Sequence, residues 1–567
     1  MRRPRTTFLY IFTVLTILVV QFGSISAAPT GVAVAQALTI PTNPSAYGAS
    51  LSNVKINGLS NSESVPPGGA FSLSLDYFNV ELITECPFCI SQIEIGYADA
   101  GAPVACAYDG IPGLVGVSGS ATLNLTAPSV PGIHYLAFDR DLQYNCPDAL
   151  AAWTHGTPDP SRYIARVVVG FSVNSTLDAV DANPGDGICE TTTAGECTLR
   201  AAVQESNALP AADAIFVPAG TYTLSLAGAD EDSAATGDLD ISGDLQLVGE
   251  ERGTTIIDAA GLDRALHVHS GLFNLSDLTI QNGSANPGGA ILTTGSASIH
   301  RVTFKDNQAP STSSAGTGGA IHINAAASAT VTESQFTNNL AGYGGGAIAS
   351  SITTTFSVTD STFTSNNGGF GGGALYPNGV SATVSNSTFV NNSGESGGAL
   401  HSNADAVQVS NSTFVGNTAI NKGAIDARVG TITVNNSTFF NNSATGVGDT
   451  LGAQNQFGGF LEVQNSINYG PSADNCDGFV SDLGNNISWP AGNDCPGTQV
   501  FPALDVLANN GGSTQTIALI SGSPAIDAGN NASCESTDQR GVARPLGSAC
   551  DIGAFESQEV NGNGTQE

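Results

Sequence analysis

Short apolar segments alternate with Gly- and Asn-rich polar segments along the middle of the chain, and the alternation has a regular period. Gly-Ala followed by Ile or Leu recurs six times, and Phe-x-x-Asn follows each occurrence roughly fifteen residues later. Successive Phe residues of the second motif lie 32, 27, 26, 25 and 25 residues apart. A period of this length is typical of a solenoid in which each repeat forms one coil. The Phe residues are Phe304, Phe336, Phe363, Phe389, Phe414 and Phe439.

The residues within the repeat predict a parallel β-helix over residues 213–500. The Ile or Leu is expected to point inward and stack on its neighbours, and the Phe to form an inner aromatic stack. The Gly residues permit a bend that a Cβ atom would block. The Asn of Phe-x-x-Asn is expected at a left-handed corner, with amides bonding from rung to rung. Coils this rich in Gly and Asn lack helical periodicity, which excludes an α-solenoid. The inward aliphatic residues are Ile291, Ile321, Ile348, Leu375, Leu400 and Ile425.

The residue after each inward aliphatic residue points outward, because side chains alternate along a strand. Four of these residues are candidate ligand-binding groups, and three of the four are expected on consecutive rungs, where an aromatic ring, an imidazole and a carboxylate can contact a glycan. An ordinary solvated column is the alternative. The four candidates are His322, Tyr376, His401 and Asp426.

A catalytic role for this column is an alternative hypothesis. Parallel β-helices host polysaccharide lyases, hydrolases and epimerases, but a fold does not carry its chemistry with it. The paired-carboxylate and Gly-His-Gly motifs expected of a polygalacturonase are missing from the sequence. No residue is therefore assigned a catalytic role. His267 and His269 share a strand face and form a weaker candidate site.

Residues 51–173 show a different pattern, in which apolar and polar residues alternate over short segments such as 71–75 and 121–125. Turn clusters rich in Pro and Gly separate these segments. Alternation of this kind predicts an antiparallel, Ig-like β-sandwich. Residues 29–50, rich in Ala, Pro, Thr and Ser, are predicted to be a linker.

Residues 174–212 are predicted to cap the open end of the β-helix, which would otherwise expose core and strand edges. Residues 197–207 are expected to form a short helix, with Thr198 as its N-cap. Oxygen ligands crowd the stretch before this helix and form a candidate Ca²⁺ site, although their spacing does not fit an EF-hand loop. Acidic turns without metal are the alternative. The candidate ligands are Asp178, Asp181, Asn183 and Asp186.

The N-terminus predicts export. Three Arg residues precede an apolar run over 8–20, and small residues follow, so residues 1–28 are expected to be a signal peptide. An uncleaved signal anchor is the alternative. No second long apolar segment follows, so no transmembrane span is expected in the mature chain. The net charge of −33 disfavours nucleic acid and anionic membranes as partners.

Ten cysteines in local clusters fit an exported chain with disulfides. Cys86, Cys89, Cys106 and Cys146 form a separate group with three alternative connectivities. Redox catalysis at the Cys-Pro-Phe-Cys motif and zinc binding by this group are weaker alternatives. The local pairs expected from spacing are Cys189 with Cys197, Cys476 with Cys495, and Cys534 with Cys550.

The sequence CTLRAA at residues 197–202 resembles the CSLREA domain of exported bacterial proteins, with Thr for Ser and Ala for Glu, and residues 220–241 continue the resemblance. That family's segment leads into a right-handed parallel β-helix of the pectin-lyase-like kind, so the expected handedness rests on this resemblance. The repeats over 280–445 resemble those of polymorphic outer-membrane proteins, whose passenger domains act in adhesion. The resemblance does not extend to that family's C-terminal membrane barrel, so autotransport is not implied.

Residues 501–556 resemble the choice-of-anchor Q domain, through SPAIDAG at 523–529 and CDIGAFE at 550–556. Residues 557–567 form a polar tail. Arg540 and Arg544, beside Asp527, Asp538 and Asp551, are expected to form an ion-pair network that closes the last coil, with catalysis by this cluster as the alternative.

Together these features predict an all-β, bacterial protein that is secreted or held at the cell surface and monomeric. The function that fits is adhesion or a structural role at the surface, with an extracellular glycan or surface protein as partner. A polysaccharide lyase, hydrolase or epimerase is the second hypothesis. A rigid stalk whose sandwich does the binding is the third.

Overall fold

The computed structural model describes residues 40–41, 43–82, 89–210, 213–229 and 231–558. The predicted signal peptide, most of the predicted linker, Cys86 and most of the polar tail lie outside these residues. Within the described part of the chain, no helix is long and apolar enough to cross a membrane.

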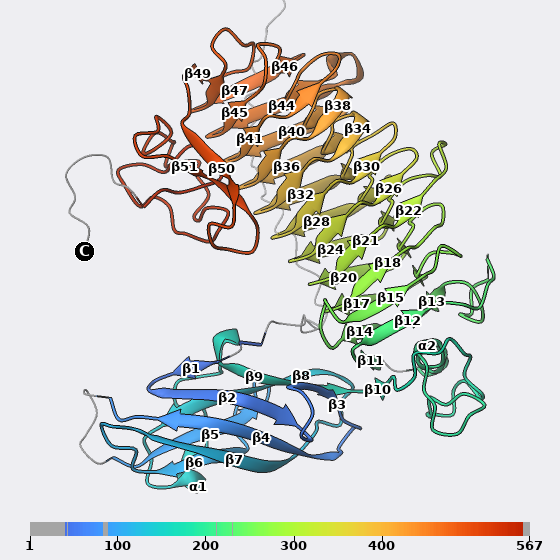
Figure 1. Cartoon of the computed structure of the whole chain (residues 1–567), viewed down its shortest axis with the longest axis vertical. Coiled ribbons are helices and arrows are strands. Elements are labelled where there is room, and N and C mark those ends of the chain that lie inside the picture. The colour runs from blue at the N-terminus through green and yellow to red at the C-terminus, as the bar shows by residue number, and fades with distance from the viewer. Residues whose placement is uncertain (1–39, 42, 83–88, 211–212, 230, 559–567) are drawn as a thin grey trace, which may run out of the picture. The chain divides into compact units, whose positions relative to one another are not determined.

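The N-terminal sandwich consists of two sheets packed on a core that includes Leu51, Leu73 and Phe138 (Figure 1). Its strand pairs are antiparallel apart from β3 with β9, as the alternating pattern predicts. Strand β1 and the start of β2 lie within the segment predicted as a linker. One sheet has the order β1 (Ser45–Ala46), β2 (Ala49–Ile56), β4 (Ala70–Asn79) and β7 (Val117–Thr126). The other has β3 (Ser62–Ser64), β9 (Tyr163–Val169), β8 (Gly132–Asp141), β5 (Ser91–Tyr97) and β6 (Ala105–Gly110), with helices α1 (Cys146–Ala149) and η1 (Pro160–Arg162) in its connections.

The solenoid is a parallel β-helix with three long sheets, named here in the order in which the chain meets them. The first sheet comprises β10 (Phe171–Ser172), β11 (Asp213–Val217), β14 (Leu245–Gly249), β17 (Leu272–Ser276), β20 (Ser296–His300), β24 (Ser328–Thr332), β28 (Thr355–Thr359), β32 (Ser381–Ser385), β36 (Ala406–Ser410), β40 (Gly430–Asn435), β44 (Gly459–Gln464) and β47 (Val480–Gly484). The second comprises β12 (Gly220–Thr223), β15 (Thr255–Asp258), β18 (Thr279–Gln281), β21 (Thr303–Lys305), β25 (Gln335–Thr337), β29 (Thr362–Thr364), β33 (Thr388–Val390), β37 (Thr413–Val415), β41 (Thr438–Phe440), β45 (Ile467–Tyr469), β48 (Ile487–Trp489) and β49 (Thr498–Gln499).

The third sheet carries the Gly-Ala-Ile/Leu motif, and a short fourth sheet precedes it in the middle coils. The third comprises β13 (Leu239–Ile241), β16 (Leu266–Val268), β19 (Ile291–Thr293), β23 (Ile321–Ile323), β27 (Ile348–Ser350), β31 (Leu375–Tyr376), β35 (Leu400–Ser402), β39 (Ile425–Ala427), β43 (Leu451–Ala453) and β46 (Cys476–Asp477). The fourth comprises β22 (Gln308–Ala309), β26 (Leu340–Ala341), β30 (Asn367–Gly368), β34 (Ser393–Ser396), β38 (Thr418–Asn421) and β42 (Ser443–Ala444). Helix η2 (Asn455–Phe457) lies between β43 and β44.

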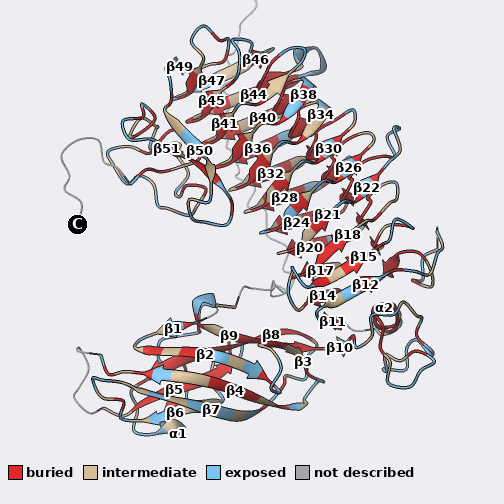
Figure 2. Cartoon of the chain, viewed as in Figure 1, coloured by how far each residue is buried: buried red, intermediate tan, exposed pale blue. Residues whose placement is uncertain are grey.

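The interior of the helix is built as the repeat predicts, and Figure 2 shows its strands largely buried. The six motif Phe rings stack in one row, with neighbouring centroids 4.6–4.9 Å apart. Each inward Ile or Leu of the motif is completely buried. Gly289 carries the second Gly position, where an added Cβ would lie 2.3 Å from the carbonyl oxygen of Gly319. A side chain there would block the stacking of successive coils.

The prediction for the motif Asn was wrong in one respect. Asn339 and its equivalents are buried and are not among the residues with positive φ, whereas the preceding residue, Asn338, has φ 55°. The motif Asn instead forms an internal ladder, in which Asn339 Nδ2 donates to Asn366 Oδ1 at 2.9 Å. The left-handed corners fall one residue earlier, and at the Asn of the sequon-like Asn386-Ser387-Thr388. The buried motif amides satisfy their hydrogen bonds through their neighbours in the stack.

Helix α2 (Leu199–Ala208) covers the first coil, as predicted. Thr198 caps it by accepting a hydrogen bond from the Ala201 amide at 3.1 Å. The Arg200 side chain is fully buried and donates to the carbonyl oxygens of Ala234 and Gly237. The disulfide Cys189–Cys197 holds the segment before the helix. Helix α2 therefore anchors Ala234 and Gly237, which belong to the long connection before strand β13.

Residues 501–556 form a module packed against the second sheet and the corner beside it. Its core includes Ile526 and Ile552, which pack on Ile467 of the coil. Thr388 and Thr413 of the coil donate to Gln515 and Gln539 of the module. Strands β50 (Leu504–Ala508) and β51 (Thr516–Leu519) form its hairpin.

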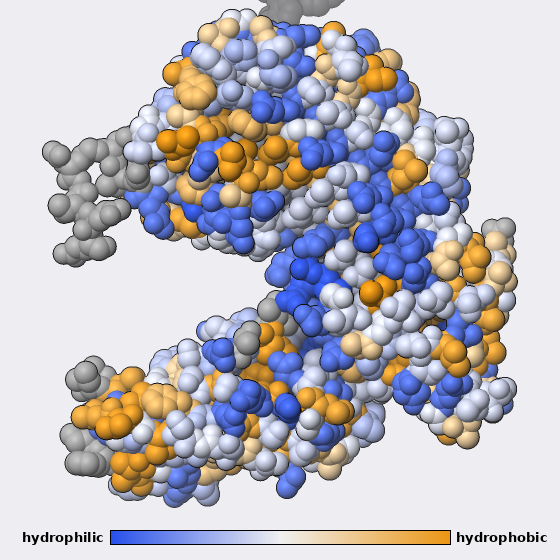
Figure 3. Space-filling view, in the orientation of Figure 1, coloured by the Kyte–Doolittle hydropathy of each residue, from blue (hydrophilic) through white to orange (hydrophobic). Residues whose placement is uncertain are grey.

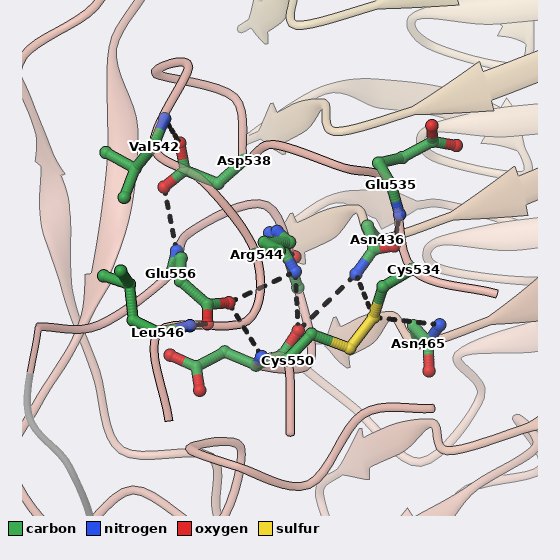
Figure 4. A network of polar contacts seen from close by, with 12 residues as sticks. Asn436, Asn465, Cys534, Glu535, Asp538, Val542, Arg544, Leu546, Cys550 and Glu556 are labelled. Atoms are coloured by element: carbon green, nitrogen blue, oxygen red, sulfur yellow. Dashed lines mark hydrogen bonds and ion pairs between the residues drawn. A yellow bond between two sulfur atoms is a disulfide. The ribbon is translucent and has the colours of Figure 1, made fainter. Parts of the chain in front are cut away.

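The module is held together by the polar network of Figure 4. Arg540 pairs with Asp538 at 2.6 Å, as predicted. Arg544 differs from the prediction, since it donates to the backbone oxygens of Asp551 and Gly553 and lies 3.7 Å from Glu556. Burial lowers the pKa of Arg544 and raises that of Asp551 to about 6. These charged groups are paired with one another inside the module, as in a structural network that closes the last coil and not in an accessible site. The disulfides Cys534–Cys550, Cys476–Cys495 and Cys106–Cys146 are also formed.

Candidate functional site

The outward column of the third sheet runs through successive coils in strict register. Each member follows an inward aliphatic residue, so all point away from the core. The column begins two coils before the Gly-Ala-Ile/Leu motif appears. Its members, in order, are Asp240, His267, Leu292, His322, Ala349, Tyr376, His401, Asp426, Gly452 and Asp477.

Three predicted residues of the column do come together, and we call them the buried triad: Tyr376, His401 and Asp426. The Tyr376 and His401 rings stack with centroids 5.6 Å apart and planes 7° apart. His401 Nδ1 lies 2.7 Å from Asp426 Oδ2, which also accepts a hydrogen bond from Gln454 Nε2 at 2.6 Å. Asn403 Nδ2 donates to the Tyr376 hydroxyl at 2.7 Å. The triad is therefore a connected polar network along neighbouring rungs.

This network does not meet solvent. Tyr376, His401 and Asp426 are 4%, 1% and 0% exposed. The Gly-rich connection covers them, since an added Cβ on Gly371 would lie 2.8 Å from the Tyr376 ring. The Phe370 ring meets His401 edge-on at 6.4 Å. Burial, with the neighbouring Tyr343 hydroxyl, raises the pKa of Tyr376 to about 12. A polymer outside the helix cannot contact the triad in this arrangement.

His322, the fourth predicted residue, is separated from the triad by the rung of Ala349. Its ring lies 3.0 Å from Thr317 Oγ1 through Nδ1 and 3.0 Å from Ser351 Oγ through Nε2. Burial lowers its pKa to about 4. His322 is thus a neutral, hydrogen-bonded ring in the wall of the coil.

The first end of the column carries a second cluster, the Asp-His cluster, made of Asp232, Asp240, His267 and His269. The ligand atoms of these four residues all lie within 4.8 Å of one another, and they are the one such group of three or more His, Cys, Asp or Glu among the described residues. His269 Nε2 lies 2.7 Å from Asp240 Oδ1. The sequence pointed to His267 and His269 but not to the two Asp residues. Extending the column back by one coil, to Leu239-Asp240-Ile241, would have placed Asp240 beside His267.

The residues predicted to bind Ca²⁺ serve mainly as turn and loop anchors. Asp178 pairs with Arg200 at 2.6 Å and accepts hydrogen bonds from two backbone amides at 225–226. Asp181 accepts from the amides of Asn183 and Glu190, and Asp186 accepts from the amide two residues later. The structure does not bring these carboxylates together among the described residues.

An aromatic stripe lies on the outer face of the second sheet in the last coils: Phe440, Tyr469, Trp489 and Phe501. The first three occupy consecutive rungs and are half-buried, and Phe501 is 51% exposed. The Phe440 and Tyr469 rings stack with their centroids 4.9 Å apart. The Phe501 ring meets the Tyr469 and Trp489 rings edge-on. Val390 and Val415 continue the stripe on the preceding rungs. Figure 3 shows hydrophobic surface around the β50–β51 hairpin and the neighbouring coil strands.

Comparison with known families agrees with the architecture. Residues 288–460 match the family model described as the right-handed β-helix region. The solenoid is a right-handed parallel β-helix. The match leaves out the cap, the sandwich and the C-terminal module, so the resemblances of the cap and of the module to known families stay predictions. No curated protein and no solved structure matches the chain.

Proposed function

We propose that the protein is an extracellular or cell-surface adhesin that binds a neutral glycan through the aromatic stripe. The stripe is the observation that carries this proposal. Half-buried aromatic rings on an outward β-strand column serve no core, and apolar groups gathered at the surface in this way are typical of interaction surfaces. Each ring offers a flat apolar face, and Tyr469 and Trp489 add a polar edge.

The stripe has the form of a platform for a chain of sugar rings. Its strands repeat at about 4.8 Å, so the rings form a continuous row along the helix. The net charge of −33 disfavours polyanionic ligands, which favours a neutral glycan.

An enzyme using the outward column is the weaker hypothesis. The only imidazole–carboxylate pair among the four predicted residues belongs to the buried triad, at 0–1% exposure. General acid–base catalysis needs these groups within hydrogen-bond reach of the substrate. The burial of the triad therefore argues against cleavage by these residues.

Export of the chain is part of the proposal. The pattern of residues 1–28 supports it, and four disulfides in the described residues are typical of an oxidising compartment. We infer a surface or secreted location and a monomer as the working unit.

A glycan array with wild-type protein and stripe variants tests the proposal. We expect Tyr469→Ala and Trp489→Ala each to weaken binding by about tenfold or more, since aromatic anchors dominate interface energetics. Phe460→Ala is the matched control, because Phe460 is 47% exposed on the first sheet of a neighbouring coil. If both stripe variants bind the glycan as strongly as the wild type does, the stripe is not the binding surface.

Two further outcomes separate the alternatives. Release of reducing ends or unsaturated products from a polysaccharide panel, abolished by Asp426→Ala in a folded variant, would replace the adhesin by an enzyme. Stripe-dependent binding to a surface protein, with no signal on the array, would replace the glycan by a protein partner. Unchanged binding after deletion of residues 51–173 would rule out the sandwich as the binding module.

A further inference from the structure

We propose that the Asp-His cluster is a binding site for a divalent transition-metal ion, with Zn²⁺ as the ion that its four ligands fit. The site is independent of the aromatic stripe and of the proposed function. It lies at the first end of the β-helix, next to the capping helix α2.

The strand geometry brings the two imidazoles together. His267 and His269 are two residues apart on an extended segment, so their side chains share a face. Their ring centroids are 3.7 Å apart. Asp240 occupies the same column on the neighbouring rung, in register with His267. Three ligands are therefore set by the sheet itself.

The spacing of the ligand atoms fits a tetrahedral ion. Bonds of about 2.0–2.1 Å to Zn²⁺ hold neighbouring ligand atoms roughly 3.3 Å apart. Asp240 Oδ1 lies 2.7 Å from His269 Nε2 and 3.6 Å from His267 Nδ1. Asp232 Oδ1 lies 3.7 Å from His269 Nε2 and supplies the fourth ligand. Shifts of about 0.3 to 0.6 Å bring these three spacings to the expected value.

Surrounding groups hold the ligands in place. The second oxygen of Asp240 accepts a hydrogen bond from the Ala234 amide at 2.8 Å. Arg200 of helix α2 holds the carbonyl of Ala234 at 3.0 Å, which ties the loop to the cap. The Glu231 carboxylate accepts from the amides of Ser233 and Thr236, closing the turn that carries Asp232. Hydrogen bonds of this kind orient metal ligands and raise affinity.

The His267 imidazole offers its ring nitrogens to an ion. No hydrogen bond to either ring nitrogen of His267 is present among the described residues, and Asp240 at 3.6 Å is too far for one. A metal ion gives this ring the partner that the protein does not.

The chemistry of the ligands selects the ion. Two imidazoles with carboxylates suit Zn²⁺ and its neighbours in the first transition row. Ca²⁺ and Mg²⁺ prefer sites made of oxygen alone. The His267 and His269 side chains are 17% and 26% exposed, and Asp232 is 78% exposed, so an ion has a path from solvent.

Calorimetry on the whole chain, after removal of metal with a chelator, tests the site. We expect one Zn²⁺ per chain and a rise in the melting temperature with added Zn²⁺, because the ion binds the folded state. The double variant His267→Ala/His269→Ala is expected to lose binding by at least about 100-fold. His155→Ala is the control, since His155 is an exposed histidine outside the cluster.

Two measurements keep the test decisive if the double variant is unstable. Asp232→Asn changes an exposed side chain and is expected to weaken Zn²⁺ binding while leaving the metal-free melting temperature unchanged. Co²⁺ in place of Zn²⁺ is expected to give the visible absorption of a tetrahedral site. Absence of Zn²⁺ binding by the wild type, full Zn²⁺ stoichiometry in the double variant, or preference for Ca²⁺ would each overturn the proposal.

Discussion

The buried triad and two members of the Asp-His cluster, Asp240 and His267, occupy the same outward column of the same sheet, yet one cluster is sealed and the other is open. Both pair imidazole with carboxylate at 2.7 Å. His401 and Asp426 are 1% and 0% exposed at the side chain, whereas His267 and His269 are 17% and 26% exposed. A shared column and similar residue types therefore do not decide whether a side chain meets solvent.

The connections in front of the sheet explain the difference. In the coils of the triad, Gly-rich segments lie over the outer face of the third sheet, with Gly344 and Gly371 against the Tyr376 ring. Before the first strand of the third sheet, the described residues 231–238 belong to a longer connection, which Arg200 anchors at Ala234 and Gly237. Glycine allows the close cover over the triad, because a Cβ atom there would meet the Tyr376 ring. The same column thus contains a sealed cluster and one that solvent reaches.

The largest expected contrast between the clusters is in stability. Asp426→Ala removes one member of a buried pair and leaves His401 without its partner, which is expected to cost about 3–5 kcal/mol. Asp232→Ala in metal-free protein is expected to change stability by less than about 0.5 kcal/mol, since the side chain is exposed. Chemical denaturation of both variants measures the difference. Equal losses would contradict the separation of roles.

Low pH is expected to destabilise the protein through His322, in the buried part of the column. The folded-state pKa of His322 is about 4, below the ordinary value of 6.5, so the unfolded chain binds more protons between these pH values. The contribution of His322 to stability is complete above pH 6.5 and falls as the pH drops towards 4, by up to roughly 3 kcal/mol. Denaturation curves of wild type and His322→Asn across this range test it. If the free energy of unfolding of the variant depends on pH as that of the wild type does, another group causes the loss of stability in acid.

The glycine cover is expected to tolerate no side chain. Gly371→Ala places a Cβ 2.8 Å from the Tyr376 ring and is expected to cost about 1–3 kcal/mol through overpacking. Gly253→Ala is the control, because an added Cβ there meets nothing within 4 Å. Thermal unfolding of both variants compares them. A loss as large in the control would indicate a general backbone effect instead of a cover.

The smallest effect is expected from opening the cover at its rim. Phe370 is 39% exposed, so Phe370→Ala is expected to cost only about 1 kcal/mol while exposing His401. Carbethoxylation followed by mass spectrometry reads out the access. In the wild type, His267 and His269 are expected to react and His401 to be protected. Reaction of His401 in the wild type would show that the triad is not sealed.

Much of the interior followed from the sequence. The 25–32-residue period and the inward Ile, Leu and Phe predicted the coil and its stacks, because a strand alternates its sides with period two. The local disulfides and the Thr198 cap were also predictable, since each depends on residues close in sequence. The motif Asn residues were predicted at the left-handed corner, but the residue before each of them takes that position. The sequence does not distinguish a left-handed Asn from its neighbour.

The candidate site was predictable only in part. The register of Tyr376, His401 and Asp426 followed from the repeat, but their burial did not. Asp232 joins the Asp-His cluster from a loop 35 residues before His267, and nothing in the local pattern marks it. The aromatic stripe is in register only because β41, β45 and β48 stack across unequal repeats.

The sequence by itself determined which side chains point into the helix and which point out, because that choice depends only on the period of the strand. The tertiary structure alone decided which outward side chains meet water. That outcome depends on how connections from other coils pack over the sheet, and on contacts such as Arg200 with Ala234 that join residues far apart in the chain.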